Sequence, residues 1–377
     1  MTLKSLTYSE FEDDPRHWSI EHTEFEDINL MVGRNSTGKT RILNVIFSIC
    51  RIISGVHTKA FNSGNFFIEV ELDEKLYSYE ISFQKAKVIQ ESLLVDGVER
   101  LSRDAVGEGL VYFASEDRSI PFQIDPEVIA IQNKNDRLQH PFINDLAQWA
   151  SSVGLYNFGS DFGKSRLMQQ PTADLTGSVG LVAIINADNT VGAYINGYQR
   201  FNQEFDKAII RDMGKLGYHL EEVAAEPLDQ LGLGLPASLL GLITVERDLG
   251  LLRNPQMGMS QGMFRAMALI IHINLAIFSK EQKLLLIDDI GEGLDYERAT
   301  EIIDLIIAAA EQEHIQVLMT SNDRFVMNRV PLNYWVVLQR TGHNVKAFTA
   351  RNSPKEFEDF KFIGLSNFDF FKDSRFH

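Results

Sequence analysis

The stretch MVGRNSTGKT (Met31–Thr40) carries the spacing G-x-x-x-x-G-K-T and decides how the rest of the sequence is interpreted. This spacing is typical of a phosphate-binding loop, in which glycines turn backbone N–H groups inward, the lysine reaches the β- and γ-phosphates, and the last hydroxyl ligates Mg²⁺. The apolar run Ile28–Val32 predicts a buried strand before the loop, and Arg41–Ile53 has apolar residues at helical spacing after it. A helix there would point the positive end of its dipole at the phosphates. We therefore expect a strand, a loop and a helix that together bind a nucleotide.

The composition is that of a large globular protein. The chain has 377 residues, of which 44% are hydrophobic and 23% charged, and its formal net charge is −16. This acidic balance argues against broad, sequence-independent coating of nucleic acid. The single cysteine, Cys50, excludes an internal disulfide and is expected to be a small core residue. The sequence predicts no signal peptide and no membrane span, so we expect a cytoplasmic protein.

The pattern of polar and apolar residues divides the chain into regions. Short alternating runs, such as Asn65–Leu72, Tyr77–Phe83 and Ala86–Gly97, predict an antiparallel meander after the phosphate-loop helix. Helices are predicted near Pro141–Val153 and Gln203–Leu216. We predict an α/β protein in which residues 1–115 and 280–350 form a nucleotide-binding lobe and residues 116–279 form a mixed, largely helical lobe.

A second informative stretch is KLLLIDDIGEGLD (Lys283–Asp295), in which an apolar run predicts a buried strand that ends in two carboxylates. In a nucleotide-binding protein, Asp288 would help to hold Mg²⁺, and Asp289 would orient or deprotonate the attacking water. Acidic residues at a strand end also cap the helix that follows, so the pattern by itself leaves a purely structural role open.

A third stretch, GMSQGMFRAMALIIHINLAIF (Gly258–Phe278), places Ser260 and Gly262 at the start of a long apolar helix. A serine hydroxyl and the N–H groups at a helix N-terminus can bind an anion, although a simple N-cap is the alternative. The stretch precedes the two-carboxylate strand. In that order and spacing, MSQGM (Met259–Met263) resembles the signature motif of ABC-type ATPases, whose usual form is LSGGQ.

Together the three stretches resemble the SMC, RecF and OLD branch of ABC-type ATPases, as a short member without a coiled-coil arm. Asn35 matches that branch's G-x-N-x-x-G-K-T loop, and DDIGEGLD (Asp288–Asp295) matches its Walker B motif and D-loop without gaps. VLMTSNDRF (Val317–Phe325) matches the next strand and the switch, with Asn322 where a histidine is common. The match covers residues 1–60 and 255–350. It implies an ABC-type ATPase head: a mixed sheet around the phosphate loop, an antiparallel β subdomain and a helical second lobe.

The resemblance also implies the site residues. Lys39, Asp289 and Asn322 would be catalytic, and Thr40 and Asp288 would hold Mg²⁺. The residues that bind ATP would be Gly33, Asn35, Ser36, Thr37, Gly38, Lys39, Thr40, Arg41, Ser260, Gln261, Gly262 and Asp295. A glutamine ligand of Mg²⁺ would come from the middle of the chain, with Gln123 and Gln132 as candidates.

The function implied is an ATP-dependent switch formed by a dimer, in which Gly33–Thr40 of one subunit and Ser260–Met263 of the other enclose each ATP. Asp289 is shorter than the usual glutamate and Asn322 cannot carry a proton charge, so slow hydrolysis is expected. Compact ATPases of this type often accompany a separate effector, such as a nuclease, in bacterial anti-phage defence. The alternatives are a DNA repair or recombination ATPase that binds duplex DNA directly, and a small-molecule kinase.

The C-terminal segment, residues 351–377, is rich in aromatic residues. We expect this tail to pack on the protein's own core, with docking of a partner as the alternative. The aromatic residues near the end of the chain are Phe368, Phe370, Phe371, Phe376 and His377.

Overall fold

The computed structural model describes residues 1–134, 136–169, 188–231, 236–250, 252–361 and 366–372. The chain divides into two compact units. Unit 1 comprises Met1–Val153 and Pro331–His377, and unit 2 comprises Gly154–Val330. These boundaries differ from the predicted lobes, because the strand that carries Asp288 belongs to the same unit as the signature helix.

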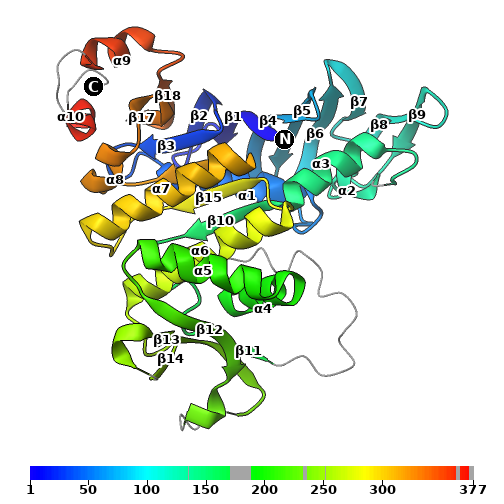
Figure 1. The fold of residues 1–377 in the computed structure, drawn as a ribbon. Helices are drawn as coiled ribbons and strands as arrows, with labels where there is room; N and C mark the ends of the chain where they lie inside the picture. Colours follow the sequence, from blue (N-terminus) through cyan, green and yellow to red (C-terminus); the bar gives the residue numbers. More distant parts are fainter. Residues whose placement is uncertain (135, 170–187, 232–235, 251, 362–365, 373–377) are drawn as a thin grey trace. The chain divides into compact units, whose positions relative to one another are not determined.

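Unit 1 contains the phosphate loop and a sheet whose strands are neighbours in the order β3-β17-β18-β2-β1-β4-β5-β6-β7-β8-β9 (Figure 1). Its strands are β1 (Thr2–Glu10), β2 (Trp18–Glu24), β3 (Ile28–Val32), β4 (Ser63–Leu72), β5 (Lys75–Gln84), β6 (Lys87–Val95), β7 (Val98–Arg103), β8 (Glu108–Phe113), β9 (Arg118–Gln123), β17 (Trp335–Thr341) and β18 (Asn344–Thr349). Its helices are α1 (Lys39–Ile53), α2 (Ala130–Asn133), α3 (Pro141–Ser151), η5 (Leu332–Tyr334), α9 (Pro354–Lys361) and α10 (Asn367–Lys372).

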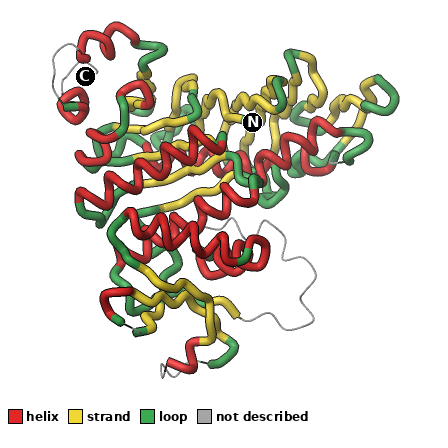
Figure 2. Tube along the Cα trace, in the orientation of Figure 1, coloured by secondary structure: helices red, strands yellow, loops and turns green. Residues whose placement is uncertain are grey.

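The antiparallel part of unit 1, from β4 to β9, follows the predicted alternation. Every second residue of β4 is buried, and each strand pairs with the next in antiparallel register. In Figure 2 these strands follow one another without an intervening helix. The buried carboxylate of Glu91 on β6 joins the sheet to α2, because it accepts hydrogen bonds from the N–H groups of Ala130 and Ile131. The predicted meander is confirmed, and it continues beyond residue 115 to Gln123.

Unit 2 combines strands that end at carboxylate and hydroxyl residues with a small antiparallel sheet. Strands β10, β15 and β16 are neighbours in that order, β15 and β16 are parallel, and a second sheet has the order β11-β13-β12 with β14 paired to β13. The strands are β10 (Val153–Asn157), which begins at the last residue of unit 1, β11 (Met168–Gln169), β12 (Leu220–Pro227), β13 (Leu239–Glu246), β14 (Arg253–Pro255), β15 (Leu284–Asp288) and β16 (Gln316–Thr320). The helices are α4 (Thr190–Phe201), α5 (Gln203–Lys215), η3 (Leu228–Leu231), η4 (Arg247–Leu249), α6 (Gln261–Ser279), α7 (Tyr296–Glu313) and α8 (Arg324–Arg329).

Helix α6 is the core helix of unit 2. It packs against α4, α5 and α7, and nearly every residue from Met263 to Ala276 is buried. The sequence pattern predicted no membrane span, but by length and hydropathy α6 would qualify as one. However, 72% of its most apolar window is buried inside the protein. Burial on all sides explains why its apolar residues do not form a single stripe.

The C-terminal tail packs on unit 1 where the structure describes it. The fully buried ring of Phe370 in α10 lies 4.8 Å from the ring of Phe357 in α9 and 6.1 Å from that of Trp335, measured between centroids. Packing on the protein's own core is therefore confirmed for Phe370. Phe376 and His377 lie outside the described residues.

Candidate functional site

The phosphate loop joins β3 to α1 in unit 1, as predicted. Strand β3 is buried along its whole length, and α1 begins at Lys39. Gly38 has a left-handed backbone (φ 106°), and a Cβ atom there would lie 2.9 Å from the ring of Trp18. A Cβ atom on Gly33 would lie 2.6 Å from the hydroxyl of Thr37. Both glycines of the motif thus leave little room for a Cβ atom, and the backbone conformation of Gly38 also favours glycine.

The side chain of Lys39 lies within this loop. Its Nζ donates to the carbonyl oxygen of Gly33 at 2.8 Å, and only 7% of the residue is exposed. Thr37 donates to the carbonyl oxygen of Arg34 at 2.9 Å, whereas Asn35, Ser36 and Thr40 are exposed. The N-cap residue of α1 is Gly38, which has no side chain to cap the helix. A helix start with an ammonium group folded into the preceding loop has the features of a phosphate site.

Arg41, which we expected to contact ATP, lies beside the loop. Its guanidinium carbon is 4.4 Å from the centroid of the Trp18 ring, and its Nη2 pairs with the carboxylate of Glu10. On the other side, Arg340 of β17 donates to the carbonyl oxygen of Ser36 at 3.0 Å. These contacts tie the loop to β1, β2 and β17. Sequence reasoning missed Trp18 and Arg340, because they lie far from the motif in the chain and carry no motif of their own.

In unit 2, β15 ends at Asp288, the first of the two predicted carboxylates, and Asp289 follows it. Asp288 is 3% exposed, and Asp289 has a left-handed backbone (φ 53°). The hydroxyl of Thr320, at the end of β16, donates to Oδ1 of Asp288 at 2.7 Å. The same hydroxyl accepts a hydrogen bond from the backbone N–H of Asp289 at 2.9 Å. The buried strand is confirmed, and Thr320 is a residue of this site that the sequence analysis did not identify.

The segment after β16 places its polar residues in two different environments. Ser321 is buried, and its hydroxyl donates to the carbonyl oxygen of Ile290 at 2.9 Å. Asn322, which we expected to be catalytic, is exposed. Asp323 caps α8 by accepting hydrogen bonds from the N–H groups of Phe325 and Val326. The backbone beside Asn322 is therefore held firmly, and the catalytic role of Asn322 itself stays a prediction.

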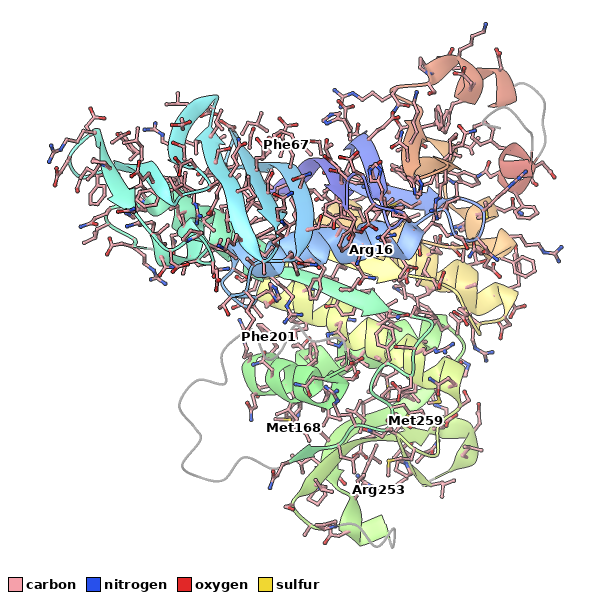
Figure 3. All side chains as sticks on the ribbon, turned by 180° about the vertical axis from the view of Figure 1, so that it is seen from behind. Arg16, Phe67, Met168, Phe201, Arg253 and Met259 are labelled. Atoms are coloured by element: carbon pink, nitrogen blue, oxygen red, sulfur yellow. The ribbon has the colours of Figure 1, made fainter. Side chains whose placement is uncertain are left out.

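The signature motif begins α6. Ser260 is exposed, and its Oγ accepts a hydrogen bond from the N–H of Met263 at 3.2 Å, so it is the N-cap of this helix. Gln261 donates to the carbonyl oxygen of Ser160 at 3.4 Å. The preceding residue, Met259, accepts a hydrogen bond at its carbonyl oxygen from Lys164 at 2.5 Å; Figure 3 labels Met259 in this part of unit 2. The capping role is compatible with anion binding, since one serine oxygen can serve both.

The D-loop packs directly against the signature helix. Arg265 donates to three backbone carbonyl oxygens, those of Ser160 at 2.7 Å, Gly159 at 2.6 Å and Glu292 at 3.0 Å. The D-loop ends at Asp295. This residue is the N-cap of α7, because its side chain accepts a hydrogen bond from the N–H of Arg298. This backbone hydrogen bond, together with the Arg298 guanidinium, holds the pKa of Asp295 below its usual value. Unit 2 thus brings Ser260, Gln261 and Gly262 to the same region as the D-loop.

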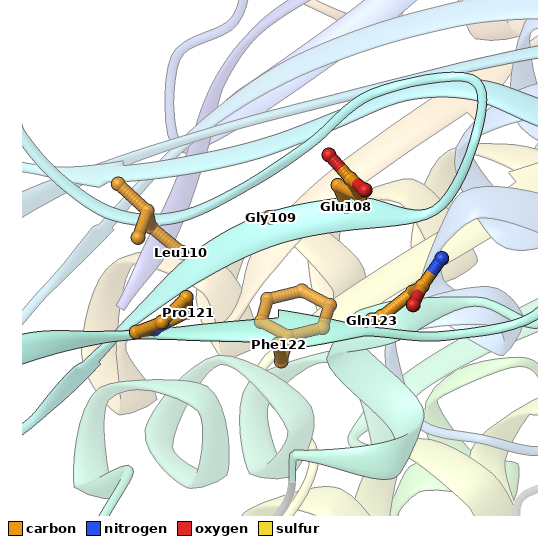
Figure 4. A pocket seen from close by; sticks show the side chains of 6 residues that line it. All are labelled: Glu108, Gly109, Leu110, Pro121, Phe122 and Gln123. Carbon is orange, nitrogen blue, oxygen red and sulfur yellow. The ribbon is translucent and has the colours of Figure 1, made fainter.

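The two candidate glutamine ligands are not where a Mg²⁺ ligand is needed. Gln132 donates to the carbonyl oxygens of Ile52 and His57 at 2.7 and 2.8 Å. It therefore lies at the far end of α1, about 20 Å from the phosphate loop at 1.5 Å per residue. Gln123 lies on β9, at the opposite end of the strand order from β3, and lines a surface pocket with Glu108, Gly109, Leu110, Pro121 and Phe122 (Figure 4). The expectation for both is corrected.

A different side-chain amide lies at the carboxylate end of β15. Asn157 is the last residue of β10, the neighbour of β15, and the next residue, Phe158, donates its N–H to the carbonyl oxygen of Asp288 at 2.9 Å. An amide oxygen is a suitable Mg²⁺ ligand. No glutamine pattern could have identified it, because the residue type is different and the sequence motifs do not extend to this part of the chain.

Comparisons with known proteins support the fold that these elements build. No protein-family model and no curated protein matches this sequence. The structure is similar to an Smc head bound to the C-winged helix domain of ScpA, with a TM-score of 0.55 and 14% identity, over 92% of this chain and 97% of that one. It is also similar to the Smc head domain with an extended coiled coil, bound to the C-terminal domain of ScpA, from Pyrococcus furiosus (TM-score 0.54, 12% identity, 96% and 99% covered). The fold of this chain is therefore that of an SMC head domain, with a mixed sheet and an antiparallel subdomain.

Proposed function

We propose that this protein binds ATP with Mg²⁺, hydrolyses it slowly, and works as a dimeric ATP-dependent switch that controls a partner effector in anti-phage defence. The observation that carries the ATPase part is the phosphate loop. Its two glycines sit where a Cβ atom would have little room, and the ammonium group of Lys39 lies inside the turn at the start of α1. The SMC-head fold supports an ABC-type ATPase at the level of fold.

The residue types that the resemblance assigns to the site suit the chemistry of Mg·ATP. Lys39 would neutralise charge on the β- and γ-phosphates, and the N–H groups of residues 33–40 would hold the phosphate oxygens. Thr40 and Asp288 would supply the hard oxygen ligands that Mg²⁺ prefers, and Asn157 would offer a further amide oxygen. Bound Mg²⁺ would draw electron density from the phosphoryl group that is transferred. Asp289 would then orient the attacking water and accept its proton.

The exposure of the signature motif supports the proposed dimer. Ser260 is exposed at the start of α6, so its hydroxyl can also reach a ligand outside this subunit. We propose that Ser260, Gln261 and Gly262 contact the γ-phosphate of ATP bound to the phosphate loop of a second copy, and that Asp295 helps to form this interface. ATP would then join two subunits, and its hydrolysis would release them.

The effector would be a separate protein. Both solved SMC heads described above are bound to a domain of ScpA, which supports a protein partner for a head of this fold. The defence setting, the nuclease effector and the slow turnover rest on the resemblance of the motifs and on the short side chain of Asp289. The net charge of −16 weighs against the alternative, a repair ATPase that binds duplex DNA itself.

The test combines nucleotide binding with molecular mass. We expect the parent protein to bind ATP tightly with Mg²⁺, to hydrolyse it, and to double its mass by light scattering when ATP is present. Lys39→Ala should lose all three properties, while its free energy of unfolding falls by only about 1–2 kcal/mol with the lost hydrogen bonds to the carbonyl oxygens of Gly33 and Arg34. Lys207→Ala is the control, because this exposed lysine pairs with Glu204 on α5. Unchanged ATP affinity in Lys39→Ala would remove the basis of the proposal, and salt-sensitive duplex binding by the parent would favour the repair alternative.

A further inference from the structure

Thr320 contacts both aspartates at the end of β15, through the side chain of Asp288 and the backbone N–H of Asp289. It ends β16, is fully buried, and belongs to the strand that runs parallel to β15. Because Ile287 pairs with Met319 in the parallel register, the next residues along the two strands, Asp288 and Thr320, lie side by side. Their contact therefore follows from the sheet and does not depend on a loop.

One hydrogen bond from Thr320 fixes the orientation of Asp288. The hydroxyl donates to Oδ1 at 2.7 Å, and a hydroxyl that donates to a carboxylate is a strong partner. An aspartate side chain has two torsions, and a short bond to one oxygen restrains both of them. The bond thereby limits the directions in which the second carboxylate oxygen can point.

Two further hydrogen bonds, both accepted by Thr320, hold the backbone at Asp289 and Ile290. The N–H of Asp289 donates to the Thr320 hydroxyl at 2.9 Å, and the N–H of Ile290 donates to the Thr320 carbonyl oxygen at 2.9 Å. Asp289 has a φ of 53°, in the left-handed region that aspartate enters more readily than most residues but that still costs free energy for any residue with a Cβ atom. A conformation of this kind persists only where the surroundings hold it in place. The direction in which the Asp289 side chain leaves the backbone thus depends on Thr320.

We propose that Thr320 is a positioning residue for ATP hydrolysis: its hydroxyl turns Asp288 toward Mg²⁺ and holds Asp289 in the conformation from which its carboxylate meets the attacking water. This inference rests on the proposed ATPase function. Groups that orient metal-binding side chains change metal affinity or activity by about 10- to 100-fold when they are lost. A residue that merely fills space in the core would not change the Mg²⁺ requirement.

The experiment compares Thr320→Val, which keeps the shape and loses the hydroxyl, with Thr320→Ser, which keeps the hydroxyl. Thr244→Val is the matched control: Thr244 is also fully buried in unit 2, and its hydroxyl has no hydrogen-bond partner among the described residues. For each variant, ATP affinity is measured by equilibrium binding with Mg²⁺ and with EDTA, and hydrolysis is followed over a range of Mg²⁺ concentrations. Thermal unfolding reports on the fold, and Thr320→Ala replaces the valine variant should the latter not fold.

We expect Thr320→Val to bind ATP like the parent in EDTA, to require about tenfold more Mg²⁺, and to hydrolyse ATP about 10- to 100-fold more slowly. Thr320→Ser should recover most of both losses, and Thr244→Val should match the parent. If the parent hydrolyses ATP and Thr320→Val has the same rate and the same Mg²⁺ requirement, the inference about Thr320 is wrong while the proposed function stands. If the parent neither binds nor hydrolyses ATP, the proposed function fails and the inference falls with it.

Discussion

Gly262 of the signature motif lies directly against Gly293 of the D-loop: a Cβ atom on Gly262 would come within 3.0 Å of the carbonyl oxygen of Gly293. On the opposite side of the contact, Gly293 has a left-handed backbone (φ 79°), and a Cβ atom there would lie 2.9 Å from Nη1 of Arg265. The absence of side chains at these two positions lets the D-loop touch α6. Two stretches that the sequence marks separately as functional are therefore one packed structure in unit 2.

The first prediction concerns this contact. Replacing glycine by alanine inside a helix usually raises the free energy of unfolding, by up to about 1 kcal/mol. Gly262→Ala should bring no such gain, because the new methyl group would press on a backbone oxygen that cannot move freely. Gly214→Ala in α5 is the control, since a Cβ atom there would meet nothing within 4 Å. Chemical denaturation of both variants gives the comparison, and an equal gain at the two positions would contradict the close packing of Gly262.

Arg265 gives a second prediction. The guanidinium of Arg265 donates to three carbonyl oxygens at once. Arg265→Lys keeps the positive charge, but a single ammonium group cannot place its donors in the same planar arrangement. We expect the free energy of unfolding to fall by about 1–3 kcal/mol, since carbonyl oxygens lose their donors. The D-loop should also become easier to cleave by protease. Arg247→Lys is the control, because the side chain of Arg247 is 68% exposed and its pair with Glu221 is long, at 3.7 Å. Identical losses in the two variants would refute a specific role for Arg265.

A third prediction is a pH dependence at Asp212, a buried residue of α5. Burial by itself would raise the pKa of Asp212, but hydrogen bonds from Arg211, from Asn274 of α6 and from Lys215 outweigh it, so the pKa is lowered on folding. The folded state then binds fewer protons than the unfolded state, and the ionised carboxylate stabilises the fold above the ordinary aspartate pKa of about 4. This stabilisation is lost as the pH falls through the lower pKa of the folded state.

We therefore expect Asp212→Asn to reduce the free energy of unfolding by about 1–3 kcal/mol at neutral pH, and the difference from the parent should shrink as the pH falls below 4. Asp304→Asn is the control, because the pair of Asp304 with Arg329 is exposed, and exposed pairs contribute about 0–1 kcal/mol. Urea titrations between pH 3 and pH 7 measure both. A loss at Asp212 that stays constant over this range would mean that its charge is not what stabilises the fold.

A fourth prediction concerns Ser260. Because Ser260 is the N-cap of α6, the substitution must keep the cap while it changes the charge. Ser260→Asp keeps an oxygen that can accept the N–H of Met263, so the helix should stay capped. The added negative charge would repel a γ-phosphate brought by a second copy. We expect this variant to unfold like the parent and to bind ATP as a monomer, but not to dimerise with ATP; Ser260→Thr, which keeps a neutral hydroxyl, should dimerise. Dimerisation of Ser260→Asp at the same ATP concentration as the parent would exclude the shared site.

Local patterns in the sequence were sufficient to predict the elements that position the candidate site. The alternation in Asn65–Leu72 is strand β4, the apolar run before Asp288 is β15, and the helical spacing after Thr40 is α1. In each case the signal lies within the element itself, because a strand or helix buries residues at a fixed period.

The contacts that orient the site could not be predicted in this way. Thr320 and Asp288 are 32 residues apart and meet only because their strands are parallel neighbours. Gln132 had the residue type of a Mg²⁺ ligand, but its amide instead joins α2 to the end of α1. Residue type and spacing say which groups are available for chemistry, whereas the tertiary fold decides which of them meet.

The last prediction concerns Asp289 and separates a slow switch from a fast motor. Asp289→Asn should fold like the parent, because asparagine tolerates the left-handed backbone found here (φ 53°) better than most residues do. The amide cannot accept the proton of the attacking water, so ATP and Mg²⁺ should still bind while hydrolysis is lost, and a dimer filled with ATP should accumulate. Asp289→Glu carries the carboxylate one methylene closer to the water and should raise turnover. Single-turnover hydrolysis and light scattering of the two variants measure these outcomes. If Asp289→Asn hydrolysed ATP as fast as the parent, another group would have to activate the water, and the short carboxylate of Asp289 could not be the cause of slow turnover.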